Sequence, residues 1–292
     1  MSSNHPDNTP SPEEKKLFSK VETRYSRSKE AVWADLEKDL FSNGIETKSK
    51  SFIGKVIPLY FRYVAAASVA ALIGAFLFMR LSTKVVTTQF AESKTVDLPD
   101  GSSVVLNANS KLTYFPYWWN FSRELKLEGE GFFQVKKGKN FEVSSSLGST
   151  RVLGTSFNIF SRNNGYQVYC STGKVAVKNT QGTEKQITPG ELVDIQPGKE
   201  IKVKKADEVA VLSWKQNRFS YNTTPLGKVF KDFENYYGVK ILVGSKEIYN
   251  NYYTGVFSRS LSKEDALTVV CKSFNLKFNT SDNNRFVISS GD

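Results

Sequence analysis

The sequence contains one histidine and two cysteines among 292 residues, and this scarcity excludes much of the side-chain chemistry on which enzymes rely. His5 lies in a tail rich in Asn, Pro and Ser, so no Ser-His-Asp triad, Cys-His pair or histidine-based metal site can be built. Cys170 and Cys271 lie too far apart to form a thiolate zinc motif. We therefore expect no cofactor, no metal ion and no conventional enzyme.

One long stretch lacks charge altogether. Residues 63–79 contain no charged side chain, and Arg62 and Arg80 bracket them. As a helix extended by Leu59 and Phe61, this stretch approaches the roughly 30 Å of a bilayer core. The alternative is a buried helix of a soluble domain, but such a helix normally keeps a polar stripe and this one has none. We predict a single transmembrane helix at residues 59–81.

Basic residues beside this helix predict its orientation. Before it lie Lys48, Lys50, Lys55 and Arg62, and after it lie Arg80 and Lys84. The positive-inside rule then places the N-terminus in the cytoplasm and the C-terminus outside the membrane. The chain has a formal net charge of +11, whereas residues 1–62 hold 11 basic and 9 acidic residues. Most of the positive charge therefore lies outside, which favours a membrane surface or an acidic partner over direct binding of nucleic acid.

The inner segment, residues 1–55, carries one amphipathic pattern. Between Ser28 and Phe41, apolar residues recur at helical spacing on an otherwise charged sequence, with Ser28 placed to cap the helix. A second short helix is predicted from Pro12. Helices this short are marginal without packing, so the apolar stripe either lies on the inner leaflet or docks in the groove of a partner. The stripe consists of Val32, Trp33, Leu36 and Leu40.

After the apolar stretch the period of the sequence changes from helical to alternating. Short β-type segments, separated by turn signals such as Pro99-Asp100-Gly101, follow one another at spacings near ten residues. This pattern predicts an antiparallel β-sandwich or roll over residues 86–205. Cys170 falls on the buried face of one such segment, as a small core residue rather than a reactive thiol.

Residues 216–292 predict a smaller α+β domain. The order is strand, helix, two strands, helix, two strands, which suggests two helices on one face of a sheet. Thr224 and Pro225 are expected to begin the first helix and Gly238 to end it, while Ser262 and Asp265 form a capping box for the second. A disulfide between Cys170 and Cys271 is not expected.

Four ordered blocks between about Val86 and Lys178 resemble the FecR family: LPDGSSVVLNANSKLTY, LEGEGFFQV, FEV and VLGTSFNI. The C-terminal domain is similar to the one attached to some FecR-like proteins, and to the short N-terminal domains of secretins and TonB-dependent receptors. The resemblance implies an anti-sigma factor of the bacterial inner membrane, with a periplasmic C-terminal part.

That resemblance also implies partners. The inner helices would hold an extracytoplasmic-function sigma factor, and we assign this contact to Trp33, Leu36 and Leu40. The periplasmic part would receive a signal from the signalling domain of an outer-membrane TonB-dependent transducer. The inducer could be an iron chelate, a glycan or another compound, and the sequence does not distinguish them. The sequence also does not distinguish release of the sigma factor from its activation.

Two other functions remain as alternatives. Crowded aromatic residues suggest a membrane-tethered module that binds glycans or cell wall, although aromatics of this kind are usually core residues. Glu128 and Glu130 suggest an acid/base pair on one strand face, or simply two solvated positions. The aromatic residues are Tyr114, Phe115, Tyr117, Trp118, Trp119 and Phe121.

The resemblance suggests one covalent reaction. Some FecR-like proteins are understood to cut their own chain at a Gly-Thr bond through an N-to-O acyl shift, and Gly154-Thr155 supplies that dipeptide. The reaction needs a hydroxyl beside its own preceding carbonyl and a glycine that tolerates a distorted backbone. The alternative is a pair chosen for packing within a strand over residues 151–160.

Overall fold

The computed structural model describes residues 12–13, 16, 26–42, 59–162, 165–282 and 284–291. It divides into two units, residues 1–64 and residues 65–292, and each is described by itself. The helix predicted from Pro12 lies almost entirely outside the described residues.

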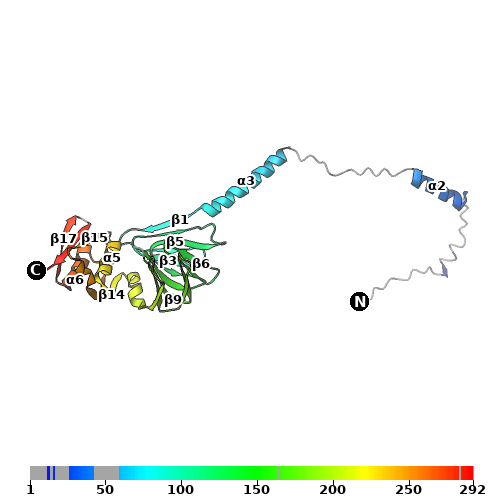
Figure 1. Cartoon of the computed structure of the whole chain (residues 1–292). Helices are drawn as coiled ribbons and strands as arrows, with labels where there is room; N and C mark the ends of the chain where they lie inside the picture. Colours follow the sequence, from blue (N-terminus) through cyan, green and yellow to red (C-terminus); the bar gives the residue numbers. More distant parts are fainter. Residues whose placement is uncertain are drawn as a thin grey trace. The chain divides into compact units, whose positions relative to one another are not determined.

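The first unit contains helix α2 (Lys29–Ser42), shown in blue in Figure 1. Its start is capped as predicted, because the Ala31 N–H donates to Ser28 Oγ over 3.3 Å. Every described side chain of the helix is exposed. A helix of this length is marginal when it is isolated in water.

Helix α3 (Leu59–Leu81) covers the apolar stretch, and its last turn continues to Ser82, whose N–H donates to the Phe78 carbonyl. Its Ala- and Leu-rich sequence favours helix. The part Tyr60–Leu81 has a mean hydropathy of 2.0 and no buried residue in the window that defines it. Among the described residues, it is the one helix long and apolar enough to cross a membrane.

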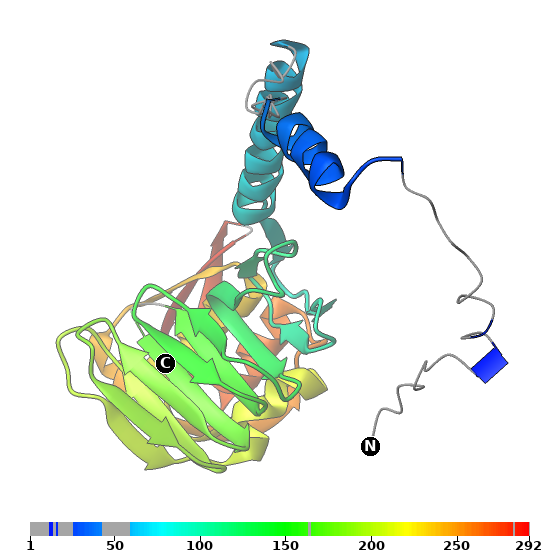
Figure 2. The ribbon, with the colours of Figure 1, turned by 90° about the vertical axis from the view of Figure 1, so that its right-hand side faces the viewer.

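The β domain, drawn mostly in green in Figures 1 and 2, consists of two sheets that share strand β5. The first half of β5 pairs with β4 and β6, and its second half pairs with β3 and β8. Pairing is antiparallel throughout except between β5 and β6. The predicted antiparallel β architecture is therefore present, with one parallel pair that the sequence did not suggest. The strands are β1 (Lys84–Thr88), β2 (Lys94–Asp97), β3 (Ser103–Leu106), β4 (Ser110–Tyr114), β5 (Arg123–Gln134), β6 (Phe141–Ser144), β7 (Gly148–Val152), β8 (Ser156–Arg162), β9 (Gly165–Thr172), β10 (Val175–Asn179), β11 (Glu184–Ile187), β12 (Glu191–Ile195) and β13 (Lys202–Lys205).

Strand β5 changes sheets at Gly129. The glycine has φ +110°, and a Cβ there would lie 2.6 Å from the Cα of Ser110, so only glycine fits. Before this position the strand alternates between buried and exposed residues, and after it Glu130 also turns inward. The bend thus feeds one strand into both layers.

The two layers enclose one apolar core. Phe133 and Phe157 stack with ring centroids 5.0 Å apart, and Phe141 packs edge-on against Phe133. Burying each such side chain contributes about 1.5–3 kcal/mol before the cost of ordering it. Cys170 is fully buried in this core, as predicted.

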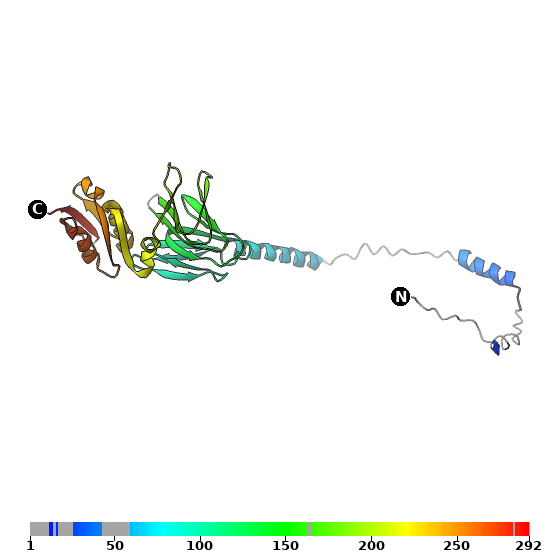
Figure 3. The ribbon, with the colours of Figure 1, turned by 90° about the horizontal axis from the view of Figure 1, so that it is seen from below.

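The C-terminal part follows a short connector of α4 (Glu208–Leu212) and η1 (Ser213–Gln216), and Figure 3 shows it in yellow to red. The predicted order of strands and helices is present. The predicted single sheet is not, because β14 pairs only with β16 while β15 pairs in parallel with β18, which also pairs with β17. The elements are β14 (Arg218–Pro225), α5 (Leu226–Tyr237), β15 (Lys240–Val243), η2 (Lys246–Asn250), β16 (Tyr252–Ser258), α6 (Lys263–Lys272), β17 (Leu276–Asp282) and β18 (Arg285–Ser290).

Helix ends in this part test the capping predictions. Gly238 ends α5 with φ +69°, and the Asp265 N–H donates to Ser262 Oγ at the start of α6, as expected. The predicted start of α5 is wrong by one residue: Pro225 is the N-cap, and β14 extends through Pro225. The reason is that Thr224 and Pro225 pair with β16.

Candidate functional site

Helix α2 displays the apolar stripe that the sequence assigns to sigma binding. Trp33, Leu36 and Leu40 follow one another at i, i+3 and i+7 and therefore share one face. All three are exposed, and the indole of Trp33 keeps 60% of its surface accessible. An exposed ion pair between Arg27 and Asp35 (3.0 Å) adds at most about 1 kcal/mol. The stripe is thus an uncovered aromatic and aliphatic surface of the type that anchors a helix in a groove.

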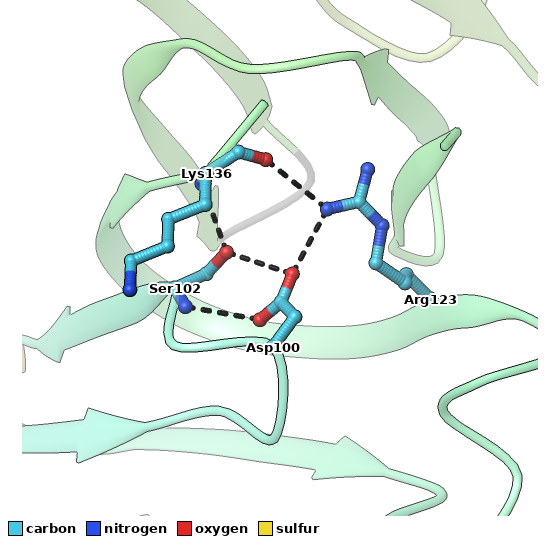
Figure 4. A network of polar contacts seen from close by, with 4 residues as sticks. All are labelled: Asp100, Ser102, Arg123 and Lys136. Carbon is cyan, nitrogen blue, oxygen red and sulfur yellow. Dashed lines mark hydrogen bonds and ion pairs between the residues drawn. The ribbon is translucent and has the colours of Figure 1, made fainter. Parts of the chain in front are cut away.

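A buried polar network holds the turn between β2 and β3 of the β domain (Figure 4). Arg123 Nη1 donates to Asp100 Oδ2 over 2.9 Å and to the Lys136 carbonyl over 3.2 Å. Ser102 donates to both carboxylate oxygens of Asp100 through its N–H and its hydroxyl, and it accepts from the Lys136 N–H. The network ties the turn at residues 99–101 to both ends of β5, so its role is structural.

The network also sets the charge state of Asp100. Burial alone would raise the pKa of this carboxyl, but hydrogen bonds from Arg123 and Ser102 outweigh burial and hold the pKa below its usual value. Asp100 is therefore ionised at neutral pH and stabilises the fold in that form.

A second polar network starts at Glu130. Its carboxylate accepts from Asn107 Nδ2 over 2.6 Å and from Asn158 Nδ2 over 3.0 Å, and the residue is only 9% exposed. Glu128, by contrast, is exposed and pairs with Lys126. Both interpretations of these carboxylates are wrong for Glu130: the bend at Gly129 turns Glu130 inward and leaves Glu128 outside, so the two share no face and only Glu128 is a solvated position.

This network reaches the C-terminal part through Arg259. Arg259 Nη1 donates to Asn107 Oδ1 over 2.8 Å, and its guanidinium lies over the rings of Phe219 and Tyr236 at 4.6 and 4.7 Å. A guanidinium stacked on two rings and hydrogen-bonded to a fixed amide is held in one orientation. Arg259 therefore joins the two parts of the second unit.

Two further contacts reinforce this joint. The Ala91 N–H donates to the Tyr236 carbonyl over 2.7 Å. At Gly238, where α5 ends, a Cβ would lie 2.6 Å from the ring of Phe90. The absence of a side chain at Gly238 therefore lets the Phe90 ring pack against the end of the helix. The joint is thus built from backbone, aromatic and charged contacts together.

A polar cavity of about 430 Å³ lies along the same joint. Its lining includes both positive and negative side chains, among them Glu130, Arg259 and the ion pair of Lys228 with Asp232 (2.9 Å). The lining atoms that have no hydrogen-bond partner among the described residues are Trp214 Nε1, Asn158 Oδ1, Tyr221 Oη, Asn235 Nδ2 and Arg259 Nε.

The aromatic stretch predicted as a platform is divided by the fold. Tyr114 and Trp119 are buried in the β core, where their rings meet edge-on at 5.7 Å. Tyr117 and Phe121 are exposed, and Trp118 stacks on Phe121 at 4.5 Å. The stretch is therefore neither wholly core nor one continuous platform.

Gly154 and Thr155 lie in the bend between β7 and β8, and not inside one strand over residues 151–160 as predicted. A Cβ on Gly154 would lie 2.6 Å from the Cα of Lys137, which gives the glycine a packing role. Thr155 is buried, and its hydroxyl has no hydrogen-bond partner among the described residues. A self-cleavage role for the pair stays a prediction.

Both cysteines are free and buried, one in each core. Burial raises the pKa of both thiols to about 11, so neither is a reactive thiolate at neutral pH. Within the described part of the chain, no group of three or more His, Cys, Asp or Glu side chains could hold a metal ion.

Sequence reasoning missed Asn107, Asn158 and Arg259. Asn107 and Arg259 are 152 positions apart and share no motif. The only usable signal was the glycine before Glu130, which marks a bulge and hence a change in which side chains face inward.

Two family models match the chain. The model described as FecR protein matches residues 84–176, and the one described as FecR, C-terminal, matches residues 218–288. Together these matches cover more than half of the sequence.

The chain is similar to two solved structures of a proposed anti-sigma factor from Parabacteroides distasonis ATCC 8503, determined at 2.50 and 1.65 Å resolution. Each is 27% identical to this chain with a TM-score of 0.65, and the alignment covers 72% of this chain and 100% of the other. No curated protein matches the chain.

The Asp100 network predicts a pH-dependent stability. At pH 7, Asp100→Asn should lower the free energy of unfolding by about 1–3 kcal/mol, because it leaves Arg123 buried without its counter-ion. The folded pKa lies below the unfolded value of about 3.9. The stabilisation is therefore complete above that value and is lost as pH falls through the folded pKa.

Urea unfolding followed by tryptophan fluorescence at pH 7 and pH 3 would measure this difference. The difference in free energy of unfolding between wild type and Asp100→Asn should be smaller at pH 3 than at pH 7. Asp97→Asn, at an exposed carboxylate in the preceding strand, is the control and should change stability by less than about 0.5 kcal/mol. If that difference were the same at both pH values, the stabilising role of ionised Asp100 would be contradicted.

The joint predicts a local effect of Arg259→Ala. Losing the bond to Asn107 and the ring contacts should cost about 1–2 kcal/mol and speed exchange of the Ala91 N–H about tenfold. Hydrogen exchange mass spectrometry of the peptide containing Ala91 measures this. Arg218→Ala, at an exposed position that begins β14, should leave the rate unchanged, and equal rates in both variants would refute the joint.

Proposed function

The chain belongs to the FecR-like family, and we propose that it is an anti-sigma factor of the bacterial inner membrane. In this proposal it holds an extracytoplasmic-function sigma factor in the cytoplasm and relays a signal from an outer-membrane TonB-dependent transducer. The proposal divides the chain into a sigma-binding segment at residues 1–55, a transmembrane helix at 59–81, a periplasmic FecR-like domain at 86–205 and a C-terminal domain at 216–292.

The observation that carries the proposal is an exposed apolar stripe on α2, which precedes an apolar helix long enough to span a membrane. An isolated helix with such a stripe is stable only against a partner. The family match and the likeness to a proposed anti-sigma factor support a sigma factor as that partner.

Orientation rests on the flanking charges. The basic residues before α3 outnumber those after it, which supports a cytoplasmic N-terminus and a periplasmic C-terminus. The sigma-binding stripe and the receiving domains then lie on opposite sides of the inner membrane, and α3 connects them.

We place the surface that receives the signal on the C-terminal domain. This domain resembles the short N-terminal domains of secretins and TonB-dependent receptors, which suggests that it binds a domain of similar fold in the transducer. Among the described strands, β16 pairs with β14 alone, and it exposes the side chains of Tyr252 and Val256. A strand edge with exposed apolar side chains can accept an added strand from the transducer's signalling domain.

The joint at Arg259 supports a relay. Because the C-terminal domain is tied to Asn107 and Ala91 of the β domain, a partner that binds one part changes the free energy of contacts in the other. The polar residues along the joint are the elements through which we propose that docking is sensed.

The alternative, a glycan- or cell-wall-binding module, rests on Tyr117, Trp118 and Phe121. Burial of Tyr114 and Trp119 removes part of the ring surface on which sugars would stack. The anti-sigma proposal therefore stands ahead of it. Sugar binding by the protein, with no sigma factor recovered on pull-down, would reverse that order.

The sigma-binding assignment predicts constitutive transcription. Substituting both Trp33 and Leu36 by Ala should free the sigma factor and raise target transcription several-fold without inducer, because two central anchors are lost. A reporter assay in cells, with membrane levels of the protein checked by immunoblot, measures this. Lys38→Ala, on the opposite face of α2, should leave transcription at its basal level.

Unchanged basal transcription in the double variant, with the protein present in the membrane, would refute the assignment. Leu40→Ala should act in the same direction with a smaller effect, since Leu40 lies one turn from the centre of the stripe.

We propose a second, covalent property: self-cleavage between Gly154 and Thr155. In an N-to-O acyl shift, the Thr155 hydroxyl attacks the Gly154 carbonyl, the peptide C–N bond breaks, and the resulting ester is hydrolysed by water. The buried, unpartnered Thr155 hydroxyl supports this proposal. Denaturing electrophoresis of the purified protein should show two fragments, and Thr155→Ala should give one full-length band. One full-length band from the wild type would refute it.

A further inference from the structure

The loop between β4 and β5 packs against the end of α3. The Trp118 ring meets the Phe76 ring edge-on with centroids 5.3 Å apart, and the Tyr117 ring lies 5.6 Å from that of Phe78. These contacts join the aromatic loop, residues 115–122, to a helix that is otherwise exposed.

Arg80 also contributes to the contact between α3 and the aromatic loop. Its guanidinium carbon lies 5.5 Å from the Phe115 ring centre and 5.6 Å from that of Trp118. The guanidinium at the end of the apolar helix therefore makes cation–π contacts with two rings of the loop. An arginine at this position normally sits at the level of lipid headgroups.

The helix geometry fixes the depth of these contacts. Phe76 precedes Arg80 by four residues, which places it about 6 Å further into the span at ~1.5 Å per residue. A ring in contact with Phe76 lies at a similar depth. If α3 crosses the membrane, Trp118 lies within the headgroup and upper acyl region and not in water.

The outward side of the loop suits that environment. Phe121, stacked on Trp118, is 66% exposed, and Tyr117 is 56% exposed. Trp119, in the same loop, is buried in the β core and fixes the loop to the domain. Exposed Trp and Tyr rings are favoured at membrane interfaces, where one part of the side chain is apolar and the other is wet.

We propose that residues 115–122 insert into the lipid interface of the same membrane that α3 crosses, and so hold the β domain against the bilayer. This inference rests on the proposed membrane anchor. It assigns the exposed aromatic residues to lipid and not to a glycan.

The test uses the full chain in nanodiscs of phosphatidylethanolamine and phosphatidylglycerol, with an NBD fluorophore on single introduced cysteines. Phe121→Cys reports the loop, Ile73→Cys the middle of α3, and Leu153→Cys an exposed bend of the β domain. The native cysteines are buried, so unmodified protein serves as the labelling blank.

Doxyl-labelled lipid should quench the probe at residue 121 by a fraction comparable to that at residue 73, whereas residue 153 should respond only to aqueous iodide. Quenching at 73 with iodide access and no lipid quenching at 121 would overturn the inference and leave the anchor intact. A probe at 121 that neither quencher reaches would also overturn it, since protein would then cover the loop. Absence of lipid quenching at both 73 and 121 would overturn the proposed anchor itself.

Discussion

Much of the β domain, and its contact with the C-terminal part, depends on the backbone conformation of Gly129. Its positive φ bends β5 against Ser110, and the bend lets one strand serve two sheets. The same bend turns Glu130 inward, where Asn107 and Asn158 pair with its carboxylate. Asn107 is then fixed so that its oxygen can accept from Arg259. One glycine thus sets a chain of consequences that ends at the joint between the two parts.

Local patterns predicted the elements whose causes are local. The uncharged stretch predicted a helix over the residues that form α3, and the alternation and turn signals predicted the β domain. The cap at Ser28, the left-handed end at Gly238 and the capping box at Ser262 follow from side chains within a few residues. Thr224 was assigned wrongly because its environment is set by a strand far away in sequence.

The site was predictable only where a single helix makes it. The stripe of Trp33, Leu36 and Leu40 can be read from periodicity, since its residues are neighbours on one helix. The joint cannot, because no local rule brings Arg259 to Asn107. The Glu128 and Glu130 hypothesis was wrong for the same reason: strict alternation holds only in a strand without a bulge.

The joint also bears on where this protein can be divided. Ala108, from the β domain, is a member of the second apolar core, which otherwise belongs to the C-terminal part. Phe90 occupies the space beside Gly238 at the end of α5. A C-terminal fragment cut at the connector would therefore lose both Ala108 from its core and the Phe90 ring beside Gly238. The two matched family models describe separate stretches of sequence, whereas one compact unit of the structure contains both.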